Sequence, residues 1–145
     1  MCRSLFSSAL SFVCSCGFGA RVGVVGSFDY PYPGLVSSFV GGLPSASVIV
    51  SGGYGVVDKT AAFEGRCLGF SVDEYKPKWN LYGLAAGAVR NSKMVDAGLS
   101  CLVVSLSSVV ESNNFSDIIE KALRAGVPVF LFGPGGELPP PSINV

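Results

Sequence analysis

Histidine is absent from the 145-residue sequence. This absence removes the commonest general base of enzymes and the commonest metal ligand of proteins. Any catalysis by this chain would therefore depend on carboxylates, tyrosine, lysine, serine, cysteine or a water molecule. We expect neither a metal site nor a cofactor.

Charged residues are also scarce, at 14% of the chain, and ten basic side chains balance ten acidic ones. The zero net charge and the lack of a basic stripe argue against a large nucleic-acid interface. Hydrophobic residues make up 49% of the sequence, which is typical of an ordered domain and not of a disordered chain. The length is that of one domain.

The cysteines show no spacing pattern that indicates disulfide bonds. The five cysteines are odd in number and irregularly spaced, so the sequence indicates no disulfide framework. Cys14 and Cys16 have no matching second pair, which argues against a structural zinc site. Cys67 and Cys101 lie in apolar segments and are expected to be buried. This usage fits a reducing compartment, and we expect a cytoplasmic protein.

The two ends of the chain differ in composition from its centre. Residues 1–20 are expected to form an N-terminal extension that is loose or packs as an amphipathic turn on the domain. In it, Arg3 precedes a short apolar stretch, Leu5 to Val13, that serines interrupt. That stretch is too short for a transmembrane helix, and no membrane partner is expected. It also resembles a weak signal peptide, so a cleaved leader, and with it secretion, stays open. Residues 134–145 are expected to form an extended Pro/Gly-rich tail.

Between these ends, residues 21–133 alternate strand-like and helix-like segments. Short apolar runs predict strands at 21–27, 47–50, 69–75, 99–105 and 127–132. Helices are expected at 34–43, 58–68 and 118–125. This alternation predicts an α/β fold with a doubly wound parallel sheet in a single domain, with helices on both faces. Such sheets bind ligands at the carboxyl ends of their strands, where we expect four regions to converge: those of Gly26, Gly52–Gly55, Arg90 and Asn113.

A glycine-rich turn follows the second expected strand. Gly52, Gly53 and Gly55 would let the backbone approach a ligand closely, and the next helix would point its first N–H groups at the same place. Asp58 suits the helix start, both as a cap and as a charge that complements the helix dipole. This layout predicts an anion site. The alternative is a turn that merely links strand to helix.

A second candidate stretch covers residues 79–94. Its small residues allow close backbone approach, and Arg90 with Asn91 can grip an anion through charged and amide hydrogen bonds. The alternative for Arg90 is a surface position or an ion pair. Trp79 is expected beside the ligand, as a platform or part of a wall, and its alternative is an ordinary core or surface tryptophan.

Several segments together resemble a known superfamily. They are VGVVGSFDY from Val22, VSGGYGVVDKTAA from Val50, KWNLYGLAAGAVRNSKMVDAG from Lys78 and ALRAGVPVF from Ala122. In order and spacing they resemble the SLOG superfamily, and within it the small YspA/YpsA-related group of Rossmann-like proteins. The resemblance extends over residues 21–132. Together with the doubly wound topology it implies about five strands in the order 3-2-1-4-5.

The resemblance implies a ligand and a set of contacts. Members of the superfamily bind nucleotides or nucleotide-derived ligands. Carried over to this chain, the implied contacts are Gly26, Ser27, Gly52, Gly53, Gly55, Asp58, Gly87, Arg90 and Asn91.

Two departures from the superfamily pattern bear on activity. Phe28 stands where relatives usually carry a basic residue, and residues 111–115 replace a glycine-rich phosphate loop. Asn113 and Asn114 tolerate left-handed geometry and can partly substitute for the missing glycines. The candidates for a catalytic acid are Asp58, Glu111 and Asp117. The alternative to a catalytic role for Glu111 is a solvated carboxylate in a loop.

Four functions are compatible with these features. The first is binding of a nucleotide or nucleotide-derived small ligand, as a sensor or sequestering module. The altered loop at residues 111–115, which follows the fourth expected strand, and the lack of histidine favour this function. The second is hydrolysis of an N-glycosidic bond, as in LOG-like phosphoribohydrolases. The third is DprA-like binding of single-stranded DNA, against which the zero net charge and few exposed aromatic residues argue. The fourth is a scaffold without a ligand. A homo-oligomer stays open.

Overall fold

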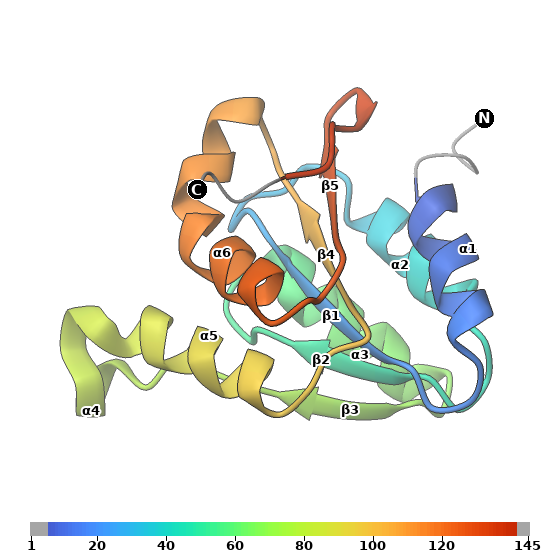
Figure 1. The fold of residues 1–145 in the computed structure, drawn as a ribbon, viewed down its shortest axis with the longest axis horizontal. Helices are drawn as coiled ribbons and strands as arrows, with labels where there is room; N and C mark the ends of the chain where they lie inside the picture. The colour runs from blue at the N-terminus through green and yellow to red at the C-terminus, as the bar shows by residue number, and fades with distance from the viewer. Residues whose placement is uncertain (1–5, 142–145) are drawn as a thin grey trace.

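A six-stranded sheet forms the middle layer of the computed structural model, which describes residues 6–141 (Figure 1). The strands lie in the order β3-β2-β1-β4-β5-β6, and all neighbours are parallel except β5 and β6. The predicted Rossmann-like order 3-2-1-4-5 is confirmed, and β6 is an addition to it. The strands are β1 (Arg21–Gly26), β2 (Val48–Ser51), β3 (Ser71–Glu74), β4 (Cys101–Ser105), β5 (Val129–Gly133) and β6 (Gly136–Glu137).

The central strands are apolar on both faces, as a sheet that is covered on both sides requires. In β1, Val22 and Val24 join the core on one face, whereas Val25 joins the core on the other. The edge strand β3 is more polar, and its Asp73 forms an ion pair of 2.9 Å with Arg21 of β1. The composition of each strand thus matches its place in the sheet.

Helices cover both faces. On one face lie α1 (Ser7–Cys16), α2 (Pro33–Gly41) and α3 (Val56–Cys67); on the other lie α5 (Ala86–Asp96) and α6 (Ser116–Arg124). The short helix α4 (Trp79–Tyr82) extends beyond the sheet at the lower left of Figure 1 and continues through the 3-10 helix η2 (Gly83–Ala85) into α5. A second 3-10 helix, η3 (Val109–Phe115), leads into α6.

The N-terminal helix α1 is part of the hydrophobic core. Ala9 and Val13 are buried, and the Phe6 ring centroid lies 5.2 Å from that of Phe39 and 4.3 Å from that of Phe132. Through these contacts α1 covers the β4–β5 side of the face that α2 and α3 also occupy. The described part of the expected extension therefore contributes to folding. The leader-like interpretation also falls on residues 1–5, which lie outside the described residues.

Two further expectations differ from the structure. The tail, expected to be extended, turns back as β6, and Glu137 accepts a hydrogen bond of 2.7 Å from Ser8 Oγ. Residues 142–145 lie outside the described range. Cys101 is buried as expected, but Cys67, at the end of α3, is exposed. Across residues 6–141, no helix is both long and apolar enough to cross a membrane.

Candidate functional site

The candidate site lies where β1, β2 and β4 end, beside the first turn of α3. This helix begins at Val56, before the predicted start, with an extended Gly55 as its N-cap residue. The prediction that Asp58 caps the helix is therefore wrong, because Asp58 is the third helical residue. Its carboxylate turns back toward the glycine turn, and only 2% of the residue is exposed.

The Asp58 carboxylate accepts hydrogen bonds from the backbone of two loops. The N–H of Gly26, at the end of β1, donates to Oδ1 at 3.1 Å, and the N–H of Tyr54, in the glycine turn, donates to Oδ2 at 3.1 Å. Ser51 Oγ donates to the Asp58 carbonyl at 2.7 Å. Backbone donors at the predicted anion site are thus occupied by a carboxylate of the protein itself.

Arg90 of α5 belongs to the same arrangement. Its Nη1 lies 3.9 Å from Asp58 Oδ2 and donates a hydrogen bond to the Gly52 carbonyl, while its Nε donates to Asn91 Oδ1 at 2.7 Å. Asn91 Nδ2 in turn donates to Asp117 Oδ2, near the start of α6, at 3.0 Å. We call these residues and their backbone partners the buried polar network. It joins β2, α3, α5 and α6.

Burial changes the acid–base properties of both charged partners. It raises the pKa of Asp58 to about 6, against the opposing effects of backbone hydrogen bonds and the Arg90 charge. It lowers the pKa of Arg90, against the charges of Asp58 and Asp117. For Asp117, burial acts to raise the pKa, but hydrogen bonds from Lys121 and Asn91 outweigh it and lower the pKa. Of the two acids in the network, Asp58 is thus the one whose pKa is shifted toward neutral pH.

Close packing explains several glycines of this region. A Cβ on Gly52 would lie 2.5 Å from Arg90 Nη1 and 2.6 Å from Asp58 Oδ2, so a larger residue would displace the charged pair. A Cβ on Gly26 would overlap the carbonyl oxygen of Ser105 in β4. Gly53 has a φ of +68°, in the left-handed region that favours glycine. The predicted ligand contacts of these glycines stay predictions.

Other predicted residues lie around the network without joining it. Ser27 is buried and accepts a hydrogen bond from the chain after β4. A Cβ on Gly87, in α5, would meet no atom within 4 Å. In η3, Asn114 Nδ2 donates to Glu111 Oε2 at 3.0 Å, and Asn113 is exposed. Within residues 6–141, no side-chain hydrogen bond connects Ser27, Glu111, Asn113 or Asn114 to the network.

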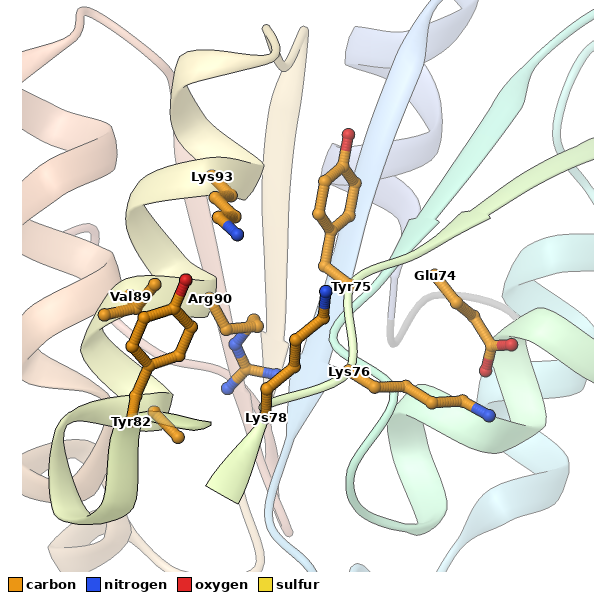
Figure 2. A pocket seen from close by; sticks show the side chains of 9 residues that line it. Glu74, Tyr75, Lys76, Lys78, Tyr82, Val89, Arg90 and Lys93 are labelled. Atoms are coloured by element: carbon orange, nitrogen blue, oxygen red, sulfur yellow. The ribbon is translucent and has the colours of Figure 1, made fainter. Parts of the chain in front are cut away.

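A cavity of about 260 Å³ opens beside Arg90, between the segment after β3 and the α4–α5 segment (Figure 2). We call it the cation pocket. Figure 2 shows Tyr82, Arg90 and Lys93 on the helical side and Tyr75 and Lys78 on the facing segment. Arg90 is the member of the predicted site that lines it. The lining residues are Glu74, Tyr75, Lys76, Lys78, Tyr82, Ala86, Val89, Arg90 and Lys93.

The cation pocket has an excess of positive charge. Its lining contains three lysines and one arginine against a single acid, Glu74, and Arg90 has Asp58 as a counter-charge at 3.9 Å. Glu74 is already paired with Arg66 at 2.9 Å, and Figure 2 shows the side chains of Glu74 and Lys76 pointing away from α5, which leaves Lys78 and Lys93 as the cations beside Arg90. Lys93 Nζ lies 5.6 Å from the centroid of the Tyr82 ring. This lining suits a small anionic group, because charge-assisted hydrogen bonds to anions are strong.

Three aromatic rings form a row on the side of the sheet where the parallel strands end. Phe28 follows β1, Tyr54 follows β2 and Trp79 begins α4 after β3; their successive ring centroids are 5.4 Å and 5.8 Å apart. We call them the aromatic row. All three are exposed, so the expectation of few exposed aromatic residues is wrong here. The contact of Trp79 with a ligand stays a prediction.

Sequence reasoning missed the lysines and tyrosines of the cation pocket. One signal was present, because Lys76 and Lys78 follow the third strand directly, at the end where parallel sheets bind ligands. A second was the helical spacing of Ala86, Val89, Arg90 and Lys93, which places them on one face of α5. That these two segments face one another depends on how α5 packs on the sheet, which no short motif reveals.

No protein-family model, curated protein or solved structure matches this chain. Within the described residues, no group of three or more cysteine, aspartate or glutamate side chains is placed to hold a metal ion. The chemistry of the network and of the cation pocket is therefore the basis for a function.

Proposed function

We propose that this protein binds a small anionic ligand, of the nucleotide or nucleotide-derived class, in the cation pocket, and acts as a sensor or sequestering module. The observation that carries the proposal is the gathering of Lys78, Arg90 and Lys93 around one cavity. Cations that converge on a concave site favour an anion such as phosphate. The resemblance to a nucleotide-binding superfamily supports the same class of ligand.

Arg90 is already held in position before a ligand arrives. Its Nε and Nη1 are bonded to Asn91 and to the Gly52 carbonyl, and its side chain is 13% exposed. Its Nη2 donates no hydrogen bond to any residue that the structure describes, and the residue lines the pocket. A guanidinium fixed in this way loses little conformational entropy when it binds an anion.

N-glycosidic hydrolysis has less support than binding. A catalytic acid must reach the reacting atoms, and none of the three candidate acids lines the cation pocket. Both oxygens of Asp58 accept backbone hydrogen bonds inside the network. Asp117 is bonded to Lys121 and Asn91, and Glu111 to Asn114. Each candidate acid thus has a structural role away from the pocket.

Isothermal titration calorimetry with AMP, ADP and ribose 5-phosphate tests the proposal. We expect at least one of these probes to bind the wild type. The double variant Lys78→Gln/Lys93→Gln should bind it roughly ten- to a hundredfold more weakly, since one or more charged hydrogen bonds of about 1.5–3 kcal/mol are lost.

The matched control is Arg124→Gln, which removes an exposed cation from the end of α6, outside the pocket. It should leave the affinity unchanged. Equal affinities of the wild type and the double lysine variant, or no binding of any of the three probes, would contradict the proposal.

A further inference from the structure

We infer that the aromatic row is a second subsite, which binds the flat ring of the same ligand whose anionic group occupies the cation pocket. This inference rests on the proposed function and assigns two chemical parts to the ligand: an anion and an aromatic ring, as in a nucleotide with its base. The ring would lie on Trp79, outside the cation pocket itself.

The aromatic row is held in place by backbone contacts. The N–H of Tyr54 donates to the buried Asp58 carboxylate at 3.1 Å. The carbonyl of Phe28 accepts a hydrogen bond from Val56 N–H at 3.2 Å, and a Cβ on Gly55 would lie only 2.7 Å from Phe28 Cα. The buried polar network that positions Arg90 therefore also positions Tyr54, whereas the start of α3 positions Phe28. A preformed aromatic surface binds with little loss of conformational entropy.

The exposure of the row marks it as a binding surface. Phe28 is 64% exposed, Tyr54 46% and Trp79 47%, although the rings contact one another. Large aromatic side chains gain free energy when they leave water, so a contiguous exposed set is unusual on a protein surface without a binding role.

The row adjoins the cation pocket at Lys78. Trp79 lines a second hollow, of about 380 Å³, together with Pro77, Lys78, Asn80 and Leu81. Lys78 lines both this hollow and the cation pocket. The two hollows therefore meet at Lys78, and on this basis we assign the anion to the cation pocket and the ring to the hollow of Trp79.

The geometry of the rings favours a single flat ring over a strand of bases. The planes of Phe28 and Tyr54 are inclined by 55°, and those of Tyr54 and Trp79 by 62°, so a flat ring stacks on one member of the row at a time. A nucleic-acid strand also needs cations along its backbone, whereas the residue after Phe28 is the acidic Asp29. Trp79, next to Lys78, is the ring that combines stacking with a nearby charge.

A comparison of AMP with ribose 5-phosphate tests the inference, because the two share the phosphate and differ in the base. We expect AMP to bind the wild type about tenfold or more tightly than ribose 5-phosphate, which is the gain that stacking of one base provides. Trp79 is the only tryptophan of the chain, so AMP should also change the protein's tryptophan fluorescence. In Trp79→Ala, the affinity for AMP should fall to that for ribose 5-phosphate, and the affinity for ribose 5-phosphate should stay unchanged.

Phe18→Ala is the matched control, because Phe18 is 93% exposed and precedes the amino end of β1, whereas the aromatic row follows the carboxyl ends of the strands. It should bind both probes like the wild type. Equal binding of AMP and ribose 5-phosphate by the wild type would refute the inference and leave the proposed function standing. A wild-type dimer in sedimentation that Trp79→Ala dissociates, with no change in AMP affinity, would make the row a self-association surface and also refute it. Binding of neither probe would overturn both proposals.

Discussion

At the scale of single residues, Asp58 and Arg90 depend on one another. Each is largely buried, and each is the nearest opposite charge that the other has in the network. A buried charge whose partner is removed costs much more than the pair itself contributes. Arg90 therefore has a structural role in addition to the anion contact predicted for it, and its variants must be tested for folding as well as for binding.

Replacing Arg90 by methionine should lower the free energy of unfolding by about 3–5 kcal/mol, because Asp58 would stay buried without its counter-charge. Adding Asp58→Asn to this variant should restore part of the loss, with a coupling of about 1–3 kcal/mol. Urea denaturation of the wild type, both single variants and the double variant measures this cycle. Strictly additive losses would mean that the two side chains do not interact.

The raised pKa of Asp58 predicts how stability changes with pH. Because the folded-state pKa of about 6 exceeds the unfolded-state value, folding favours the protonated form. The contribution of this group to stability therefore falls as pH rises from about 4 to about 6 and stays level above that. Between pH 5 and pH 7 the Asp58-dependent part of the unfolding free energy should drop by about 1 kcal/mol. Urea denaturation should show this drop in the wild type relative to Asp58→Asn, and identical pH profiles would contradict it.

Two glycines offer a matched test of packing. Gly52→Ala should destabilise the protein by about 1–3 kcal/mol, because the new Cβ would displace Arg90 and Asp58. Gly87→Ala, in α5 with open space around it, should be stabilising by up to about 1 kcal/mol. Thermal unfolding of both variants checks the opposite signs. A neutral Gly52→Ala would show that the network yields easily, and unchanged AMP binding by Gly87→Ala would argue against the predicted ligand contact of Gly87.

At the scale of secondary-structure elements, the strands could be predicted from the sequence, but the packing of helix α1 against the sheet could not. Apolar runs such as 21–27 and 99–105 predicted β1 and β4 because a strand covered on both faces must be apolar throughout. For the N-terminal segment, the sequence leaves open a loose extension or an amphipathic turn on the domain, because its serine-interrupted sequence has a weak amphipathic pattern; in the structure it is helix α1 and joins the core. Its role depends on contacts with Phe39 and Phe132, far along the chain.

Helix α1 should prove necessary for stability. Phe6→Ala should cost about 3–5 kcal/mol, since the Phe6 ring is buried between two other rings. Phe18→Ala, which removes a fully exposed ring, should change stability by less than about 0.5 kcal/mol. Chemical denaturation of the two variants measures the difference. Similar stabilities would mean that α1 is dispensable.

At the scale of the whole molecule, the fold has two places where a ligand could bind. One is the buried polar network, where β1 and β2 end, and the other is the cation pocket between β3 and α5. Parallel strands that end on one side of the sheet bring the regions of Gly26, Gly52 and Arg90 together, as the sequence predicted. Asn113, the fourth region of that prediction, is exposed in η3 and has no hydrogen bond to them among the described residues. The sequence did not show that Asp58 occupies the backbone donors of the network, because a hydrogen bond between residues far apart leaves no local pattern. It also did not show that the cations gather between β3 and α5, away from the η3 segment.

The position of the anion is the central claim, and amide NMR spectra recorded during a titration with AMP test it most directly. If the ligand binds in the cation pocket, the largest shift changes should fall in residues 74–93, with Lys78, Tyr82 and Lys93 among them. In Lys78→Gln/Lys93→Gln these changes should appear only at much higher AMP concentrations. Largest changes in residues 107–117, which follow β4 and include η3 and the start of α6, would contradict the account and place the anion in this segment.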